Sequence, residues 1–175
     1  MEAFFLPRES GQRFCLFHPA RNYKACGAVI YVHPFAEEMN KARRMAALQA
    51  RAMANAGFDV LQIDLLGCGD SSGDFSDATW QAWNDDILAG YLWLRTRSQA
   101  PLTLWGLRAG CLLAANAADK LTDEQVNFIF WQPVFSGKRH WQPFMRRKMA
   151  GGLTSGSARG GREGIEQHLA AGQTV

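Results

Sequence analysis

A chain of 175 residues, of which 47% are hydrophobic and 20% charged, has the composition of one soluble globular domain. No apolar run approaches the length of about 18 residues that a membrane-spanning helix needs. The first residues, 1–7, have no basic start and only a short apolar run, so we expect no secretory signal and a cytoplasmic location.

The net charge of +3 is unevenly distributed. Residues 1–137 carry 12 Lys and Arg against 14 Asp and Glu, whereas residues 138–175 carry 7 against 2. We therefore predict a core over 1–137 and a basic, glycine-rich tail over 138–175. A basic tail can bind nucleic acid, but we interpret this one as a solvated surface segment with no nucleic-acid partner.

The four cysteines form neither a C-x-x-C pair nor a zinc-ligand spacing. We expect reduced thiols, most of them buried, and no metal site. Glycine-rich turns can bind phosphate, yet no G-K-[ST] follows the glycines here, so a P-loop is not predicted. No cofactor is expected.

The predicted elements begin with two short strands, 4–7 and 12–18, around a turn at Ser10 and Gly11. A continuous apolar run at 28–32 is typical of a strand that is buried on both faces. A helical pattern follows over 37–56 and ends at Gly57, and 58–63 is the next strand.

A glycine-rich loop covers 66–75, and Asp77 is placed to cap a helix over 78–97. A strand at 102–105, a helix over 109–120 and a strand at 126–131 complete the clear elements. Strand and helix alternate from residue 28 onward. This alternation predicts the α/β class, with a mostly parallel, doubly wound sheet and helices on both faces.

The pentapeptide Gly106-Leu107-Arg108-Ala109-Gly110 lies between a predicted strand and a predicted helix. This is the layout of a nucleophile elbow, G-x-S-x-G, in which small residues at both ends force the central side chain out at the carboxyl edge of the sheet. The central residue is Arg108. Its guanidinium stays protonated and cannot attack an acyl carbon.

Two further segments carry chemistry-bearing residues after strands. Segment 32–38 reads VHPFAEE and follows the first long strand. Segment 64–74 reads DLLGCGDSSGD and resembles the D-x-x-G-x-G-x-S-x-G loop of many α/β-hydrolases. We expect this second loop to be mainly structural.

Together the three segments cover about 26–135 and resemble the α/β-hydrolase superfamily. The stretches 33–45, 61–75 and 105–110 are most similar to the exosortase A system-associated hydrolase 2 family. The resemblance implies a hydrolase of an ester or similar bond, linked by gene neighbourhood to exopolysaccharide and exosortase loci. It implies a small-molecule substrate, or one linked to a sugar or a lipid.

The resemblance also implies an oxyanion hole. The loop after the first long strand supplies one backbone N–H in this superfamily, and the residue after the elbow supplies the other. Pro34 has no N–H to give, so Phe35 is the natural first donor. Ala109 would be the second donor.

The chain departs from the superfamily beyond the elbow. The triad normally continues with an acid and a histidine after later strands, but only His140 and His168 lie downstream of Arg108. His140 lies in a segment that resembles a lid and that could also rest on an anionic membrane. The fold thus resembles a hydrolase lacking its last strands and helices. A homodimer could cover the apolar edge at 126–131.

Two functions from different classes stay open. The first is a hydrolase with an unorthodox site, in which His33 with Glu37 or Asp70 activates water beside Arg108. The second is a non-catalytic module in which Arg108, at a helix N-terminus, holds a carboxylate or phosphate. A third possibility is that Arg108 pairs with Glu37 or Asp70 and closes the pocket.

Overall fold

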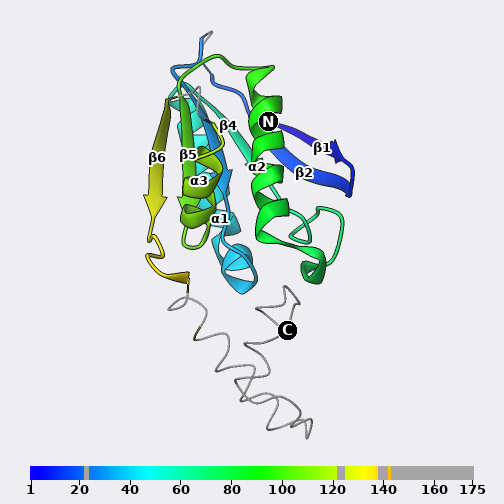
Figure 1. The fold of residues 1–175 in the computed structure, drawn as a ribbon. Coiled ribbons are helices and arrows are strands. Elements are labelled where there is room, and N and C mark those ends of the chain that lie inside the picture. Colours follow the sequence, from blue (N-terminus) through cyan, green and yellow to red (C-terminus); the bar gives the residue numbers. More distant parts are fainter. Residues whose placement is uncertain (22–23, 122–124, 138–141, 143–175) are drawn as a thin grey trace, which may run out of the picture. The chain divides into compact units, whose positions relative to one another are not determined.

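A computed structural model describes residues 1–21, 24–121, 125–137 and 142. The sheet and the helices that cover it belong to one unit, Met1–Pro133. Figure 1 shows this sheet with α2 and α3 in front of it and with β1 and β6 at opposite edges. The strands are β1 (Glu2–Arg8), β2 (Gly11–His18), β3 (Gly27–Val32), β4 (Phe58–Ile63), β5 (Leu102–Leu107) and β6 (Val126–Trp131). The helices are α1 (Glu37–Asn55), η1 (Phe75–Asp77, a 3₁₀ turn), α2 (Trp80–Arg95) and α3 (Gly110–Ala118).

The sheet is mostly parallel, as predicted. Its order is β1-β2-β4-β3-β5-β6. The first two strands form an antiparallel hairpin that joins β4, and the remaining pairs are parallel. Parallel neighbours place the carboxyl ends of β3, β4, β5 and β6 at one edge. The predicted functional segments all follow strands at that edge.

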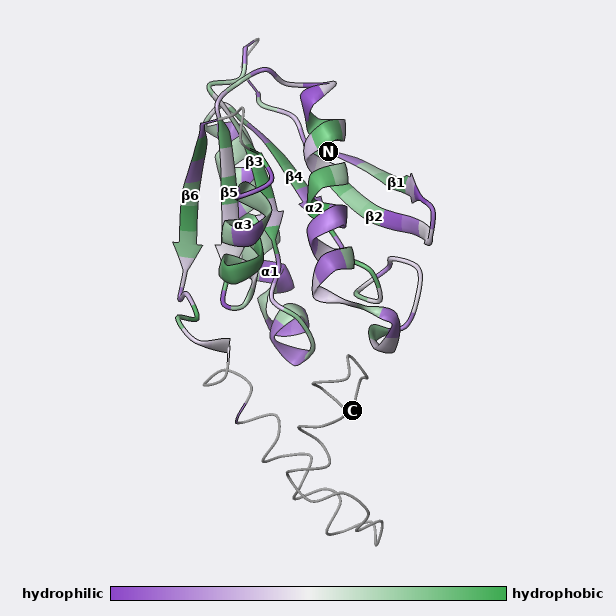
Figure 2. Cartoon of the chain, in the orientation of Figure 1, coloured by the Kyte–Doolittle hydropathy of each residue, from purple (hydrophilic) through white to green (hydrophobic). Residues whose placement is uncertain are grey.

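Each face of the sheet has its own apolar cluster. On one face Val29, Tyr31 and Trp105 pack against the small residues Ala46 and Ala50 of α1. On the other face the alternate positions of β3 and β5, including Ile30 and Leu104, join the buried residues of α2 and α3. Figure 2 shows the resulting pattern of hydrophobic strands between helices of mixed hydropathy. The continuous apolar run of β3 is therefore buried on both faces, as its sequence predicts.

The predicted capping role of Asp77 is wrong. Helix α2 begins at Trp80, and the Thr79 hydroxyl accepts a hydrogen bond of 3.1 Å from the N–H of Ala82. Asp77 closes η1 instead, where its carboxylate accepts from the N–H of Asp74 at 2.8 Å. The backbone of Ala78 is extended, so the chain leaves one helical turn before it enters the next helix. Two nearby candidate caps compete here, and the later one begins the long helix.

A buried ion pair connects three parts of the unit. Arg13 of β2 donates from Nε to Asp86 of α2 at 2.7 Å, and both side chains are 1% exposed. The same carboxylate oxygen accepts from the N–H of Leu66, at the start of the glycine-rich loop, at 2.8 Å. Arg8 of β1 lies 3.5 Å from the other carboxylate oxygen. Asp86 therefore connects the hairpin and the glycine-rich loop to α2.

Strand β6 is an edge of the described sheet. Its side chains Phe128 and Phe130 are 43% and 42% exposed. The homodimer through this edge stays a prediction. The predicted lid, His140 and His168 lie outside the described residues. Among the described residues, no helix combines the length and the apolarity needed to cross a bilayer.

We expect Asp86→Ala to lower the free energy of unfolding by about 3–5 kcal/mol, because it leaves the Arg13 guanidinium buried without its counter-charge. Urea unfolding at pH 7 measures the change. The matched control is Asp85→Ala, which removes the exposed carboxylate paired with Lys120 at 3.2 Å. That change should cost less than about 1 kcal/mol. Equal losses in the two variants would contradict the role given to Asp86.

Candidate functional site

The turn between β5 and α3 has the backbone of a nucleophile elbow. Arg108 has a φ of 54°, a left-handed conformation that costs a residue other than glycine about 1–3 kcal/mol. Its N–H donates to the carbonyl oxygen of Trp131 at 3.0 Å. The surrounding structure thus holds a strained turn that presents Arg108 at the carboxyl edge of the sheet.

The two glycines of the pentapeptide are required by close backbone contacts. A Cβ on Gly106 would lie 2.6 Å from Cα of Cys111, and a Cβ on Gly110 would lie 2.2 Å from the carbonyl oxygen of Val32. No larger side chain fits at these distances. The end of β5, the first turn of α3 and the end of β3 therefore meet at the elbow, as the small residues in the sequence predict.

The side chain of Arg108 pairs with Glu38, one residue beyond the predicted partner Glu37. Arg108 Nε donates to Glu38 Oε1 at 3.3 Å, and each side chain is about one-third exposed (36% and 29%). Asp70, the other predicted partner, lies 3.5 Å from Arg43 instead. The sequence places two acids in the first turn of α1. It does not show which of them the helix presents to the elbow.

A groove of about 650 Å³ opens beside this ion pair. Arg108 and Lys41 contribute positive charge to it, and Glu38 contributes negative charge. Its other walls include Met45, Phe130 and Trp131. The elbow residue therefore lines a concave surface that combines charged and apolar side chains.

His33 is a buried residue, 3% exposed, at the end of β3. The N–H of Leu65 donates to its Nε2 at 3.1 Å, so this nitrogen is the acceptor. The proton is then on Nδ1, which donates to the carbonyl oxygen of Pro34 at 2.6 Å. Burial lowers the pKa of His33, which also favours the neutral ring. These contacts fit a structural link between the ends of β3 and β4 better than a base, and the catalytic role stays a prediction.

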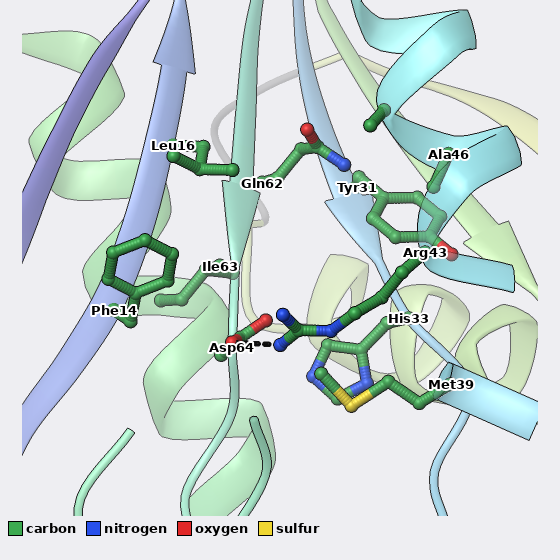
Figure 3. Close-up of a pocket in the computed structure, with 11 residues that line it drawn as sticks. Phe14, Leu16, Tyr31, His33, Met39, Arg43, Ala46, Gln62, Ile63 and Asp64 are labelled. Atoms are coloured by element: carbon green, nitrogen blue, oxygen red, sulfur yellow. Dashed lines mark hydrogen bonds and ion pairs between the residues drawn. The ribbon is translucent and has the colours of Figure 1, made fainter. Parts of the chain in front are cut away.

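A second cluster lies at the end of β4, and sequence reasoning missed its centre. Asp64 accepts from Arg43 of α1 at 2.5 Å and from the N–H of Asp70 at 3.0 Å. Figure 3 shows Arg43 reaching Asp64 beside His33, at one side of a cavity of about 140 Å³. Tyr31 of β3 and side chains of β2, β4 and α1 complete this cavity. Asp70 thus helps to fix the glycine-rich loop and lies apart from Arg108.

Of the two predicted oxyanion-hole residues, Ala109 belongs to the elbow and Phe35 belongs to the loop after β3. The Cβ position of Gly110 faces the carbonyl oxygens of Val32 and His33, so the loop that carries Phe35 runs beside the turn. The Phe35 ring stacks on Trp83 with centroids 5.6 Å apart. Ala109 precedes α3, and its N–H forms no hydrogen bond within the described residues. The donor roles of Phe35 and Ala109 stay predictions.

The thiols near the site are not activated nucleophiles. Burial raises the pKa of Cys68 to about 12 and also raises the pKa of Cys111, one helical turn after Arg108. Both groups are therefore protonated near neutral pH, whereas attack on a carbonyl needs a thiolate.

We expect the free energy of unfolding to fall when the pH is lowered from 7 to 5. Burial lowers the pKa of His33 and of His18 from their ordinary 6.5. Below that value the unfolded chain binds protons that the folded chain does not bind. The stabilisation is therefore complete above pH 6.5 and declines below it, for His33 by at most about 1.4 kcal/mol per pH unit.

Urea unfolding at pH 7, 6 and 5 measures this dependence. This interval spans the ordinary pKa of histidine. The variant His33→Gln should show a shallower pH dependence than the wild type. Identical slopes in the two proteins would show that His33 titrates normally in the folded chain.

The chain resembles known hydrolases in sequence and in fold. The model of the family described as serine aminopeptidase, S33 matches residues 23–158. Human Protein ABHD12B is 30% identical over 111 residues, which are 63% of this chain and 29% of that protein. The chain thus spans less than a third of this curated relative.

Two solved structures show the same fold over part of their length. XC6422 from Xanthomonas campestris, described as an a/b serine hydrolase without lid, matches with a TM-score of 0.62 and 24% identity, over 74% of this chain and 59% of that one. A carboxyl esterase from Bacillus coagulans matches with a TM-score of 0.63 and 18% identity, over 86% and 51%. These likenesses show the α/β-hydrolase fold, of which the chain covers a little over half. Because the family model covers most of its residues, the chain belongs to the serine aminopeptidase S33 family of α/β-hydrolases.

Proposed function

We propose that the elbow binds the anionic group of a ligand, a carboxylate or a phosphate, through Arg108. The observation that supports this most strongly is the position of the guanidinium. Arg108 stands where the fold otherwise carries its nucleophile, on a turn with a φ of 54°. A side chain that cannot attack, held in a strained conformation at the mouth of a groove, fits binding better than covalent catalysis.

The local charges favour an anion at this position. Arg108 lies two residues before α3, and the dipole of that helix places partial positive charge at its N-terminus. Lys41 lines the same groove. Glu38 offsets one of these charges, so the charged residues that line the groove comprise two cations and one anion.

Arg108 has donors to spare after it has paired with Glu38. That contact uses Nε, and the two terminal amino groups of Arg108 form no hydrogen bond within the described residues. A planar carboxylate or a phosphate can accept two parallel hydrogen bonds from such a fork. The ion pair therefore orients the guanidinium and still leaves its outer edge for a ligand.

We expect acetate and inorganic phosphate to bind at the elbow, and Arg108→Gln to weaken that binding by about tenfold or more. NMR chemical-shift titration at low salt measures both affinities. The variant Glu38→Gln should bind anions more tightly than the wild type, because it removes a competing carboxylate. Added salt should weaken binding in every protein.

The matched control is Arg97→Gln. Arg97 is a partly exposed arginine that also pairs with one glutamate, Glu2, at 3.6 Å. Its removal should leave the affinity for acetate unchanged. Equal losses in Arg97→Gln and Arg108→Gln would mean that the anions respond only to net charge, which would overturn the proposal.

A second candidate function is hydrolysis of an ester or similar bond, in an exopolysaccharide- or exosortase-linked pathway. Membership of a hydrolase family and the elbow backbone favour it. So does the likeness to a chain described as a carboxyl esterase. The substrate would then be a small molecule or one linked to a sugar or a lipid. Arg108 would position that substrate, and a water activated by another group would attack it.

The hydrolysis of p-nitrophenyl acetate and butyrate separates the two functions. We expect no turnover by the wild type above that of the Arg108→Gln variant, because the elbow carries no nucleophile. Wild-type turnover that His33→Ala abolishes, in a variant that still folds by circular dichroism, would support the hydrolase and a catalytic His33. Arg108→Ser tests whether a hydroxyl at the elbow is sufficient for attack.

A further inference from the structure

We infer that the anion held by Arg108 carries an apolar chain, which lies in the groove between α1 and β6. This inference rests on the proposed function and deepens it by naming the ligand class. The ligand would be an amphiphile with a carboxylate or phosphate at one end and a medium-length alkyl chain at the other.

The walls of the groove are unusually apolar for an exposed surface. Met45 of α1 is 59% exposed and lines this groove. Trp131 and Leu107 add further apolar surface. Large apolar side chains that gather around one concavity mark a binding surface more often than scattered ones do. The volume of about 650 Å³ lies within the range of about 300–1,000 Å³ that is typical of small-molecule sites.

The charged and apolar parts of the groove belong to one surface. Arg108 and Lys41 offer positive groups, whereas most of the remaining wall is apolar. A small inorganic anion would leave the apolar walls in water. A neutral alkane would leave the cations without a ligand. An amphiphilic anion matches both parts, which is the charge complementarity that selects this occupant.

Trp131, in the apolar wall, packs against buried aromatic side chains of the sheet. Trp131 packs edge to face on Trp105 with centroids 4.8 Å apart, and Trp105 packs on Tyr31 at 4.4 Å. Trp105 is fully buried in the cluster beneath α1. This packing fixes the Trp131 part of the wall, so that residue loses little conformational entropy on binding.

The test compares acetate, octanoate, octyl phosphate and 1-octanol by NMR titration or calorimetry, at concentrations below micelle formation. Octanoate should bind at least about tenfold more tightly than acetate, because several methylene groups leave water. 1-Octanol should bind more weakly than octanoate, because it lacks the charge. The ratio of octyl phosphate to octanoate shows which head group the elbow prefers.

One variant tests the groove itself, and it has a matched control. Met45→Ser should reduce the affinity for octanoate about threefold or more and leave the affinity for acetate unchanged. The control is Leu48→Ser. Leu48 is 45% exposed on the same helix and does not line the groove. Its replacement should change neither affinity.

The outcomes separate this inference from the proposed function. Acetate binding that depends on Arg108, with octanoate no tighter, would overturn the apolar chain and leave the anion site intact. Absence of binding by every anion would overturn the proposed function and this inference with it. Equal losses of octanoate affinity in Leu48→Ser and Met45→Ser would place the chain outside the groove and overturn the inference.

Discussion

The contact between the first turn of α3 and the end of β3 is the constraint on which the site depends. At Gly110 the helix comes so close to the carbonyl oxygen of Val32 that a Cβ would lie 2.2 Å away. This contact fixes where α3 begins, and it forces the chain through a left-handed residue at Arg108. The loop that carries His33 and Phe35 lies beside the turn for the same reason. The elbow and the position of the loop beside it depend on this one close packing of backbone on backbone.

Arginine changes what such an elbow can do. A serine at this position offers a short nucleophile directly above the helix N-terminus, whereas Arg108 extends a permanent positive charge away from the turn to Glu38 and the groove. The backbone strain is the same for both residues, because it is set by the glycines and not by the central side chain. The same turn backbone that positions a nucleophile can therefore position a ligand-binding side chain without a change in its conformation.

Much of the fold and part of the site could be predicted from the sequence. The strands β3 to β6 are short apolar runs between turn-forming residues, and the elbow is a local pattern of small residues. Both can therefore be recognised from the sequence alone. The partner of Arg108 was not visible, because the choice between Glu37 and Glu38 depends on how α1 is rotated against the sheet. The pair of Arg43 and Asp64 was missed for the same reason. Thr79, and not the predicted Asp77, caps α2. Two good capping residues lie two positions apart, and only the packing of α2 selects between them.

The hydrogen bond from the N–H of Arg108 to Trp131 has a thermodynamic consequence. Trp131 gives its carbonyl oxygen to the turn and its ring to the wall of the groove. A ligand in the proposed site that prefers this position of Trp131 would therefore also stabilise the strained conformation of the elbow. Such a coupling is reciprocal: a substitution that relaxes the turn would weaken the binding of that ligand by the same free energy by which the ligand stabilises the turn.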